Sequence, residues 1–505
     1  MTNSQNKNHE TTLVKQVSQI ARKYSGSKRV GLAGKIHRRK RKENNKMSEE
    51  MKQEQGSESR ELGTKPVAGL FVKYSFLTLI GMLAQAIMVI LEGIIIGRGL
   101  GETGLACVGL IMPLEYFMLA LGGFFAIGVS TLAAMKLGDG DEQGARRVYG
   151  QGLWFSFIAI VAIAAVIFIF AGPIAGLLGA TPDLFDSIVL FIRIFMFGYP
   201  FCIIGHIAVY MARVDEKPSI ATWAMTLSAI LALVWLYASV FILKLGIAGC
   251  AGYYASSIGI WGFFILYFFF SKNTIFKVQM SDLHLDKEII ANIVKIGFPY
   301  LLVQASSTVF TIVLNNFLGK FGGELDIAAF AVINGYVVYI LMMITQSTTG
   351  GLQPIASYNF GAKLYDRVKD LIKVGIGGNL IAVYVLAIVF WLAATPVCAL
   401  FIGAGSELIP IAAKYTRIVI SCTALGLTAN LMSGYFQAVE SVVESTVLGI
   451  CRYIIFGIPA IFIMANTLGI TGVWFSQPVS DILSFVLSLV LAAMEIKRLK
   501  NMKAA

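Results

Sequence analysis

The sequence predicts an all-α integral membrane protein of about twelve transmembrane helices. Of its 505 residues, 57% are hydrophobic and 14% are charged, whereas charged residues make up ~25% of soluble proteins. Apolar blocks of roughly 20 residues or more, enough to cross a ~30 Å hydrocarbon layer, recur along the chain. The alternating polar and apolar pattern of a membrane β-barrel is missing, so a helical bundle is expected.

Each apolar block is expected to make one crossing. In chain order the blocks cover residues 71–97, 104–135, 150–178, 186–211, 219–242, 246–270, 290–318, 325–356, 371–402, 409–436, 444–466 and 469–495. The longest polar break falls near residues 271–288 and divides the spans six and six. The expected domains are a tail (1–66), a first six-helix lobe (67–275), a second lobe (276–498) and a C-terminal tail (499–505).

The N-terminal tail is rich in basic residues, with HRRKRK at 37–42, and nearly lacks long apolar side chains. Such a stretch buries too little surface to offset its ordering entropy, so residues 1–66 are expected to be disordered. On a polytopic protein the basic cluster is interpreted as contacting membrane lipid headgroups, with no nucleic-acid partner. Met47 resembles an ordinary start, which leaves open that residues 1–46 are an upstream extension.

Lys and Arg concentrate in the loops after the even-numbered spans, for example Lys136, Arg146 and Arg147 after the second span. The opposite loops carry little beyond Arg98, Lys244 and Lys320. Positive charge in short loops is retained on the cytoplasmic side. A multi-pass plasma-membrane protein with both termini in the cytoplasm is therefore expected.

Several function classes lack support in the sequence. Six cysteines are scattered through apolar runs without CxxC spacing, so neither a disulfide framework nor a metal site is expected. No Walker motif and no catalytic motif such as HExxH or GxSxG is present, which argues against an enzyme. Active transport would have to use an ion gradient, and no cofactor is implied. His206, inside the fourth span, could relay protons or satisfy a packing hydrogen bond.

Two stretches of the chain resemble each other. AAMKLGDGDEQGARRV (133–148) aligns with ASYNFGAKLYDRVKDL (356–371), at a constant offset of about 223 residues, as expected for an internal repeat. Both stretches end an even-numbered span. Because six crossings return the chain to its starting side, the two halves are expected to be parallel repeats with substrate bound near the membrane midplane.

Glu92 is the strongest candidate functional residue. It lies in the first apolar run, and an ionised acid at that depth costs on the order of 3 kcal/mol or more unless it faces water or takes up a proton or cation. At the repeat offset Glu92 falls on Asn315, followed by Asn316. The two halves therefore place polar groups of different chemistry at equivalent positions.

Glu115, in the second span, could join Glu92 in a two-carboxylate site, where the like charges would raise the pKa of one acid and poise it for proton exchange. The alternatives are that Glu115 pairs with a buried base such as Arg193 or Arg452, or that it faces water. Gln85 lies seven residues before Glu92 on the same helix face and could bind cargo or a neighbouring helix.

Three segments carry a resemblance to a known family: LEGIIIGRGLGETGLACVGL (91–110), GFFAIGVSTLAAMKLGDGD (123–141) and GLQPIASYNFGAK (351–363). They resemble the multidrug and toxic compound extrusion (MATE) transporters, most closely the bacterial MepA-like branch, over about residues 62–498. The resemblance implies two six-helix lobes in a bacterial inner membrane that export organic cations and drugs in exchange for protons or sodium. It also implies that the motif residues shape a gate or have a structural role there: Gln353, Pro354, Ser357, Asn359 and Gly361.

The chain departs from the family at three places. The resemblance implies aspartate at Glu92, and an asparagine and an aspartate in the fifth span where this chain has Ala232 and Leu236. A glutamate found in the seventh span of one branch is replaced by Ser307. With these partners missing, a proton is expected as the coupling ion rather than sodium, which requires several oxygen ligands.

The preferred hypothesis is a secondary antiporter that exchanges cationic lipophilic drugs for protons, acting as a monomer. A lipid-linked oligosaccharide flippase is the main alternative, although it would be expected to line its cavity with several Arg or Lys. The basic residues inside spans are interpreted as lying near interfaces or in ion pairs. The candidate polar residues of the cavity are Gln85, Gln304, Ser307, Asn315, Asn316, Asn334 and Gln346.

Overall fold

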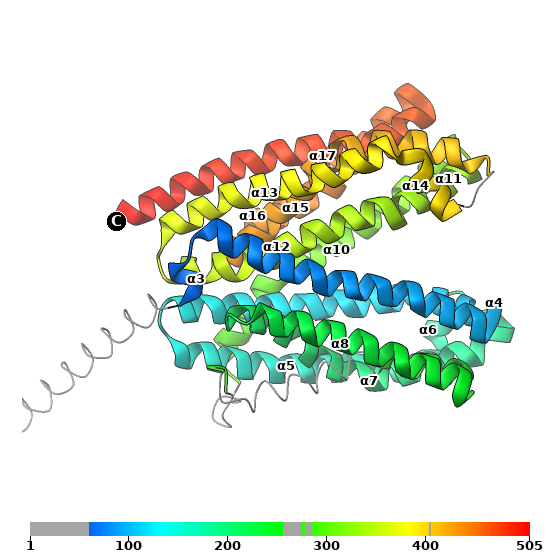
Figure 1. Ribbon diagram of the computed structural model, residues 1–505, viewed down its shortest axis with the longest axis horizontal. Coiled ribbons are helices and arrows are strands. Elements are labelled where there is room, and N and C mark those ends of the chain that lie inside the picture. Colours follow the sequence, from blue (N-terminus) through cyan, green and yellow to red (C-terminus); the bar gives the residue numbers. More distant parts are fainter. Residues whose placement is uncertain (1–59, 256–273, 278–284, 403–405, 505) are drawn as a thin grey trace, which may run out of the picture. The chain divides into compact units, whose positions relative to one another are not determined.

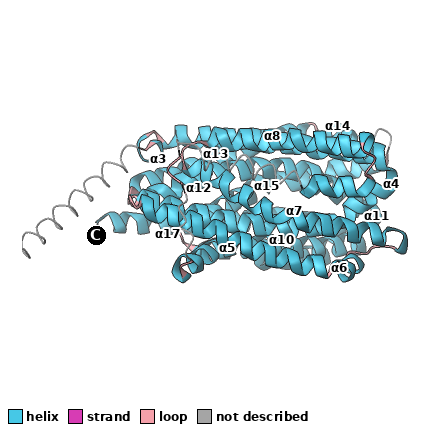
Figure 2. Ribbon diagram, turned by 90° about the horizontal axis from the view of Figure 1, so that it is seen from below, coloured by secondary structure: helices cyan, strands magenta, loops and turns pink. Residues whose placement is uncertain are grey.

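The computed structural model describes residues 60–255, 274–277, 285–402 and 406–504. Within these ranges the regular secondary structure is helical and no strand is present (Figure 2). Ten helices of this part are long and apolar enough to cross a membrane. The last of them, Val442–Lys503, has non-helical backbone angles at Gly469 and contains two expected crossings. The predicted fold class, an all-α membrane bundle, is confirmed.

The helices of the first half are α3 (Glu61–Thr64), α4 (Val67–Gly138), α5 (Glu142–Ile169), α6 (Ala171–Leu177), α7 (Pro182–Val214), α8 (Pro218–Tyr237) and the π-helix η1 (Ala238–Ile242). Those of the second half are α10 (Lys287–Phe321), α11 (Glu324–Val332), η3 (Ile333–Val338), α12 (Tyr339–Gly361), α13 (Tyr365–Leu392), α14 (Ala394–Ile402), α15 (Leu408–Ala438), α16 (Val442–Ile450), η4 (Cys451–Gly457) and α17 (Ile458–Ala504). Residues 246–255 are helical and begin the expected sixth span, whose remainder lies outside the described residues.

The backbone repeats between the two halves at the offset seen in the sequence. The expected third and ninth spans, 150–178 and 371–402, are not continuous, because each breaks near its end. The breaks have nearly the same angles, φ −92° and ψ 23° at Phe170 and φ −96° and ψ 21° at Ala393. Positive φ recurs at equivalent residues, in the pairs Gly140 and Lys363, Glu216 and Glu440, and Gly246 and Gly469.

The two halves meet closely where α4 ends beside the end of α12 (Figure 1). A Cβ atom on Gly138 would lie 2.0 Å from the carbonyl oxygen of Tyr358, and one on Gly361 would lie 2.1 Å from that of Met135. The contacts are reciprocal, since Gly138 and Met135 are the repeat equivalents of Gly361 and Tyr358. Glycine is needed at both positions because backbone, and not a flexible side chain, fills the adjoining space.

α3 joins the two halves at this same end of the bundle. The Leu62 side chain is fully buried, and its N–H donates to the Glu216 carboxylate at 2.8 Å. Its carbonyl oxygen accepts from Asn359 Nδ2 and Arg367 Nη2, both at 3.0 Å. The expected disorder of residues 1–66 is therefore wrong for this segment, because one buried leucine and three hydrogen bonds offset its ordering entropy. Residues 1–59, including the basic cluster, lie outside the described residues.

A buried ion pair lies inside the second half. Arg452 Nε and Nη2 both donate to Asp481 Oδ1, at 2.9 and 2.8 Å, and the two side chains are 5% and 1% exposed. The Arg452 carbonyl oxygen also accepts a hydrogen bond from Ser480. This pairing agrees with the interpretation of Arg452 as a member of an ion pair, and it neutralises a cation that would otherwise lie unpaired at membrane depth.

The close backbone contact at Gly361 predicts that adding a methyl group at this position lowers the stability of the protein. Gly361→Ala should lower stability by about 1–3 kcal/mol, because Met135 O cannot move without shifting α4. The matched control is Gly377→Ala on α13, where no atom lies within 4 Å of the added Cβ, and this change should be neutral or stabilise by up to about 1 kcal/mol. Equilibrium unfolding of the purified variants in detergent measures both. Equal stabilities would contradict the close contact.

Candidate functional site

Glu92 is buried near the end of the first crossing of α4, before the kink at Gly101, with its residue 6% exposed. Its two oxygens accept hydrogen bonds from two consecutive tyrosines of the helix that starts at residue 246. The Tyr253 hydroxyl donates to Glu92 Oε2 at 2.9 Å, and the Tyr254 hydroxyl donates to Oε1. Both donors are neutral, so within the described residues the carboxyl group is held without an ion pair.

The tyrosines are themselves held by aromatic packing. The Tyr253 and Tyr254 rings meet edge to face, with centroids 5.1 Å apart. Tyr254 also packs on Phe191 and Phe195 of α7, at 5.4 and 6.1 Å between centroids. Such contacts restrict both rings, so the hydroxyls are positioned before the carboxyl group binds them.

The sequence did not indicate that this pair of tyrosines binds Glu92. The family resemblance directed attention to the fifth span, where Ala232 and Leu236 of α8 are apolar and fully buried. The donors to Glu92 come from the sixth span instead. Tyrosine is common in apolar helices near a membrane interface and breaks no hydropathy pattern, so no charge or motif marked these two residues.

Glu115 lies on α4 after its kink at Gly101 and is half-buried. Its carboxyl group is close enough to Glu92 for the two to interact electrostatically. No hydrogen bond or ion pair joins Glu115 to another side chain of the described residues. The alternative pairing with Arg452 is wrong, because Arg452 binds Asp481. Arg193 is exposed and its guanidinium lies over the Phe168 ring, not at Glu115.

The other predicted cavity residues are dispersed. Asn316 donates to the carbonyl oxygen of Ile312 in its own helix at 2.8 Å, and Asn315 has a buried Oδ1 with no partner in the described part of the chain. No hydrogen bond links any of them to Glu92. The exposed members are Gln304, Asn316 and Gln346, and the half-buried members are Gln85, Ser307, Asn315 and Asn334.

The motif residues lie at the α3 end of α12, where the halves meet. Ser357 donates to the Ala438 carbonyl oxygen at 2.8 Å. Asn359 donates to Leu62 and accepts from Arg367 Nε at 2.7 Å. Gln353 and Pro354 are buried on the same stretch. These contacts are interhelical packing contacts, as the structural interpretation of the motif expects.

The remaining candidates take part in packing. His206 contacts Cys202 of its own helix, with 3.4 Å from Nδ1 to the Cys202 carbonyl oxygen, which favours the packing interpretation over a proton relay. All six cysteines are free. In the described part of the chain no group of three or more His, Cys, Asp or Glu is arranged to hold a metal ion.

A bundle of apolar, membrane-length helices built from two parallel repeats defines a polytopic membrane protein. The sequence comparison gives the family. The MatE family model matches residues 78–238 and 299–463, one segment in each half, and the chain belongs to this family. The relatives found are named as exporters and transporters, so the family is one of transporters and not of enzymes.

Curated relatives and solved structures agree. The chain is 25% identical over 409 residues to the multidrug export protein MepA of Staphylococcus saprophyticus, covering 81% of this chain and 89% of the relative. It is 25% identical over 420 residues to MepA of Staphylococcus aureus, covering 82% and 91%. The solved outward-facing conformation of a multidrug resistance MATE family transporter matches with a TM-score of 0.81 at 22% identity, covering 88% of this chain and 98% of that structure. This last likeness concerns the fold.

The two tyrosine hydrogen bonds to Glu92, called the clamp below, predict an energetic coupling between the carboxyl group and the hydroxyls. Tyr254→Phe removes one donor to a charged group, and about 1.5–3 kcal/mol of stability should be lost. In a Glu92→Gln background the loss should be smaller, because the amide oxygen is neutral. The double-mutant cycle, measured by unfolding in detergent, should give a coupling of about 1 kcal/mol or more. Tyr237→Phe, at an exposed tyrosine, is the control, and a coupling no larger than its own would contradict the clamp.

Proposed function

We propose that the chain is a secondary active multidrug exporter that exchanges cationic, lipophilic compounds for protons, with Glu92 as the coupling group. The observation that carries this proposal is the buried carboxyl group held by two neutral hydroxyls. Such a group can gain or lose a proton without breaking an ion pair. The names of the curated relatives, multidrug export proteins, support the substrate class.

In the proposed cycle the charge on Glu92 decides which ligand the site accepts. When ionised, the carboxylate attracts an organic cation from the surrounding apolar space, and Glu115 adds a second negative group within electrostatic range. When Glu92 takes up a proton, that attraction is lost and the drug is released. Protonation also turns one carboxyl oxygen into a donor, so the hydroxyl of Tyr254 or Tyr253 that faces it can rotate its hydrogen away and accept instead, and this change in bonding can bias the position of the helix that carries the tyrosines.

The geometry favours a proton over sodium as the coupling ion. Sodium is bound by several oxygen ligands, as are other hard cations. Around Glu92 the two tyrosine O–H groups donate to the carboxylate, so both would have to turn before their oxygens could bind a metal cation. The fifth-span side chains that could add oxygen ligands are replaced by Ala232 and Leu236.

The flippase alternative is less well supported. A pyrophosphate-linked cargo would need several basic side chains facing one cavity. Arg452 is neutralised by Asp481, and Arg193 and Arg417 lie over the rings of Phe168 and Trp391. We further propose that the transporter acts as a monomer in a bacterial inner membrane, with the α3 end and both termini in the cytoplasm, as the Lys and Arg distribution indicates.

Transport by charge-altered variants tests the coupling role. In efflux-deficient cells, wild type should lower ethidium accumulation and Glu92→Gln should not, because the amide cannot take up a proton. Glu92→Asp should retain part of the activity, since the charge remains but the carboxylate is one methylene further from the tyrosines. Asp186→Asn, at an exposed acid of α7, should export as wild type does.

Dissipating the two ion gradients separately distinguishes the coupling ions. Export should stop when the proton gradient is collapsed and should continue when the sodium gradient is. Full activity of Glu92→Gln would remove Glu92 from the mechanism. Failure of wild type to export any organic cation would overturn the proposed function and favour the flippase alternative.

A further inference from the structure

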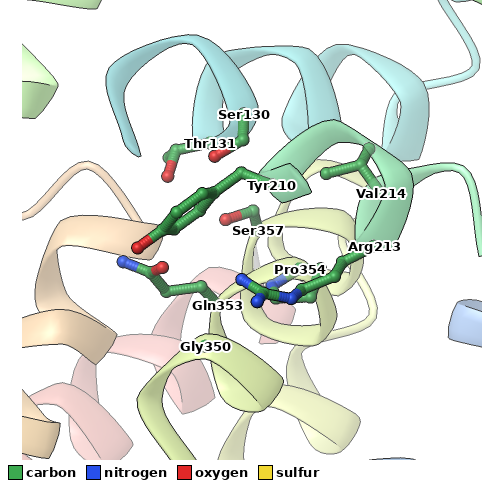
Figure 3. A pocket seen from close by; sticks show the side chains of 9 residues that line it. All are labelled: Ser130, Thr131, Tyr210, Arg213, Val214, Gly350, Gln353, Pro354 and Ser357. Atoms are coloured by element: carbon green, nitrogen blue, oxygen red, sulfur yellow. The ribbon is translucent and has the colours of Figure 1, made fainter. Parts of the chain in front are cut away.

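A small polar pocket lies between the two halves. It is nearer to the middle of the bundle than the contact between Gly138 and Gly361. Residues of α4, of the end of α7 and of α12 line the pocket. Its free space is enough for about one water molecule. Figure 3 shows the Arg213 guanidinium, the Gln353 amide and several hydroxyl groups around this space. The lining residues are Ser130, Thr131, Tyr210, Arg213, Val214, Gly350, Gln353, Pro354 and Ser357.

Arg213 is the unusual member of this pocket. Its residue is 5% exposed, yet its guanidinium makes no ion pair within the described part of the chain, where the side chain that it bonds is that of Tyr210. Its one aromatic contact there is with the Tyr210 ring, 5.0 Å from the guanidinium carbon to the centroid. A guanidinium has five N–H donors and no acceptor. Burying a cation without a counter-charge costs several kcal/mol, so a negatively charged partner is expected.

Further donors face the same space without partners. Thr131 is 2% exposed and its hydroxyl has no hydrogen-bond partner in the described residues. The Gln353 amide, also buried, makes no hydrogen bond there either. The hydroxyls of Ser130 and Ser357 already donate to backbone carbonyls. The pocket thus offers N–H and O–H donors from α4, α7 and α12 around one cation.

Within the described residues no carboxylate forms an ion pair with this cation. Asp and Glu are absent from the pocket lining. The two acids that follow Arg213 in sequence are bound elsewhere, Asp215 to Lys217 Nζ at 2.8 Å and Glu216 to the Leu62 N–H at 2.8 Å. Gly350 leaves room for the guanidinium, since a Cβ there would lie 3.3 Å from Arg213 Nη1. The cation therefore reaches across from α7 to the backbone of the second half.

We propose that this pocket is a binding site for a small inorganic anion of the size of chloride, held by Arg213, Thr131 and Gln353. Arg213 supplies the charge, Thr131 Oγ1–H and the Gln353 amide supply further donors, and the narrow space excludes polyatomic organic anions such as gluconate. Because Arg213 and Thr131 belong to the first half and Gln353 to the second, the anion bridges the halves. It stabilises the arrangement in which they are closed at the α3 end.

Thermal unfolding of the purified protein in different sodium salts tests the site, at equal ionic strength and pH. The melting temperature of wild type should be about 2 °C or more higher in chloride than in gluconate, which is too large for the pocket. Bromide should reproduce the chloride shift. Arg213→Gln should abolish the difference between chloride and gluconate. Arg193→Gln, at an exposed arginine of the same helix that also lies over an aromatic ring, should keep it.

Thr131→Val provides a nearly isosteric second variant, which decides the matter if Arg213→Gln does not fold. Removing an unpartnered hydroxyl should leave stability in gluconate unchanged or slightly higher. In chloride the variant should lose part of the wild-type shift. No chloride-specific shift in wild type, or the same shift in Thr131→Val or Arg213→Gln, would overturn the proposal and leave water as the partner of these donors. The experiment does not involve transport, so its result is independent of the proposed export function.

Discussion

A carboxyl group inside an apolar bundle must find donors, a counter-charge or a proton, and Glu92 and Asp481 meet that requirement differently. In the second half Asp481 is bound by the Arg452 guanidinium through two hydrogen bonds to one oxygen, which fixes both charges together. In the first half Glu92 is bound by two neutral tyrosine hydroxyls. A pair of opposite charges resists protonation, whereas a carboxyl group among neutral donors can exist in either state. Asp326 of the second half is also buried and accepts from a neutral donor, the Trp474 indole N–H at 2.9 Å, so Glu92 is distinguished by having a neutral hydroxyl donor on each of its two oxygens.

The closest contacts between the two halves lie at the α3 end of the bundle, which is the opposite end from Glu92. There Gly138 and Gly361 allow the halves to touch through their backbones, and Leu62 receives hydrogen bonds from the second half while binding Glu216 of the first. Opening that end would have to separate the glycine contact, release α3 and divide the Arg213 pocket. A change at Glu92 can therefore act on distant contacts only by moving whole helices, because the interface is closely packed and has few intermediate arrangements.

Much of the fold was predictable from the sequence because membrane spans carry a strong apolar signal and the repeat was visible at Gly138 and Gly361. Glu92 was predictable for the same reason, as a charge in an apolar run. The tyrosine pair was not, since Tyr253 and Tyr254 differ little in hydropathy from their neighbours. Leu62 was missed because a single buried leucine in a polar segment has no periodic pattern. The helix breaks at Phe170 and Ala393 were missed because both lie inside uninterrupted apolar runs.

The central claim is that Glu92 exchanges a proton for a cationic drug. Proton release on drug binding tests it most directly: purified protein in weakly buffered detergent solution is mixed with ethidium while a pH indicator is followed. Wild type should release protons in proportion to the drug bound, and Glu92→Gln should release none at matched occupancy. Equal release from both proteins would contradict the account, because the proton would then come from another group.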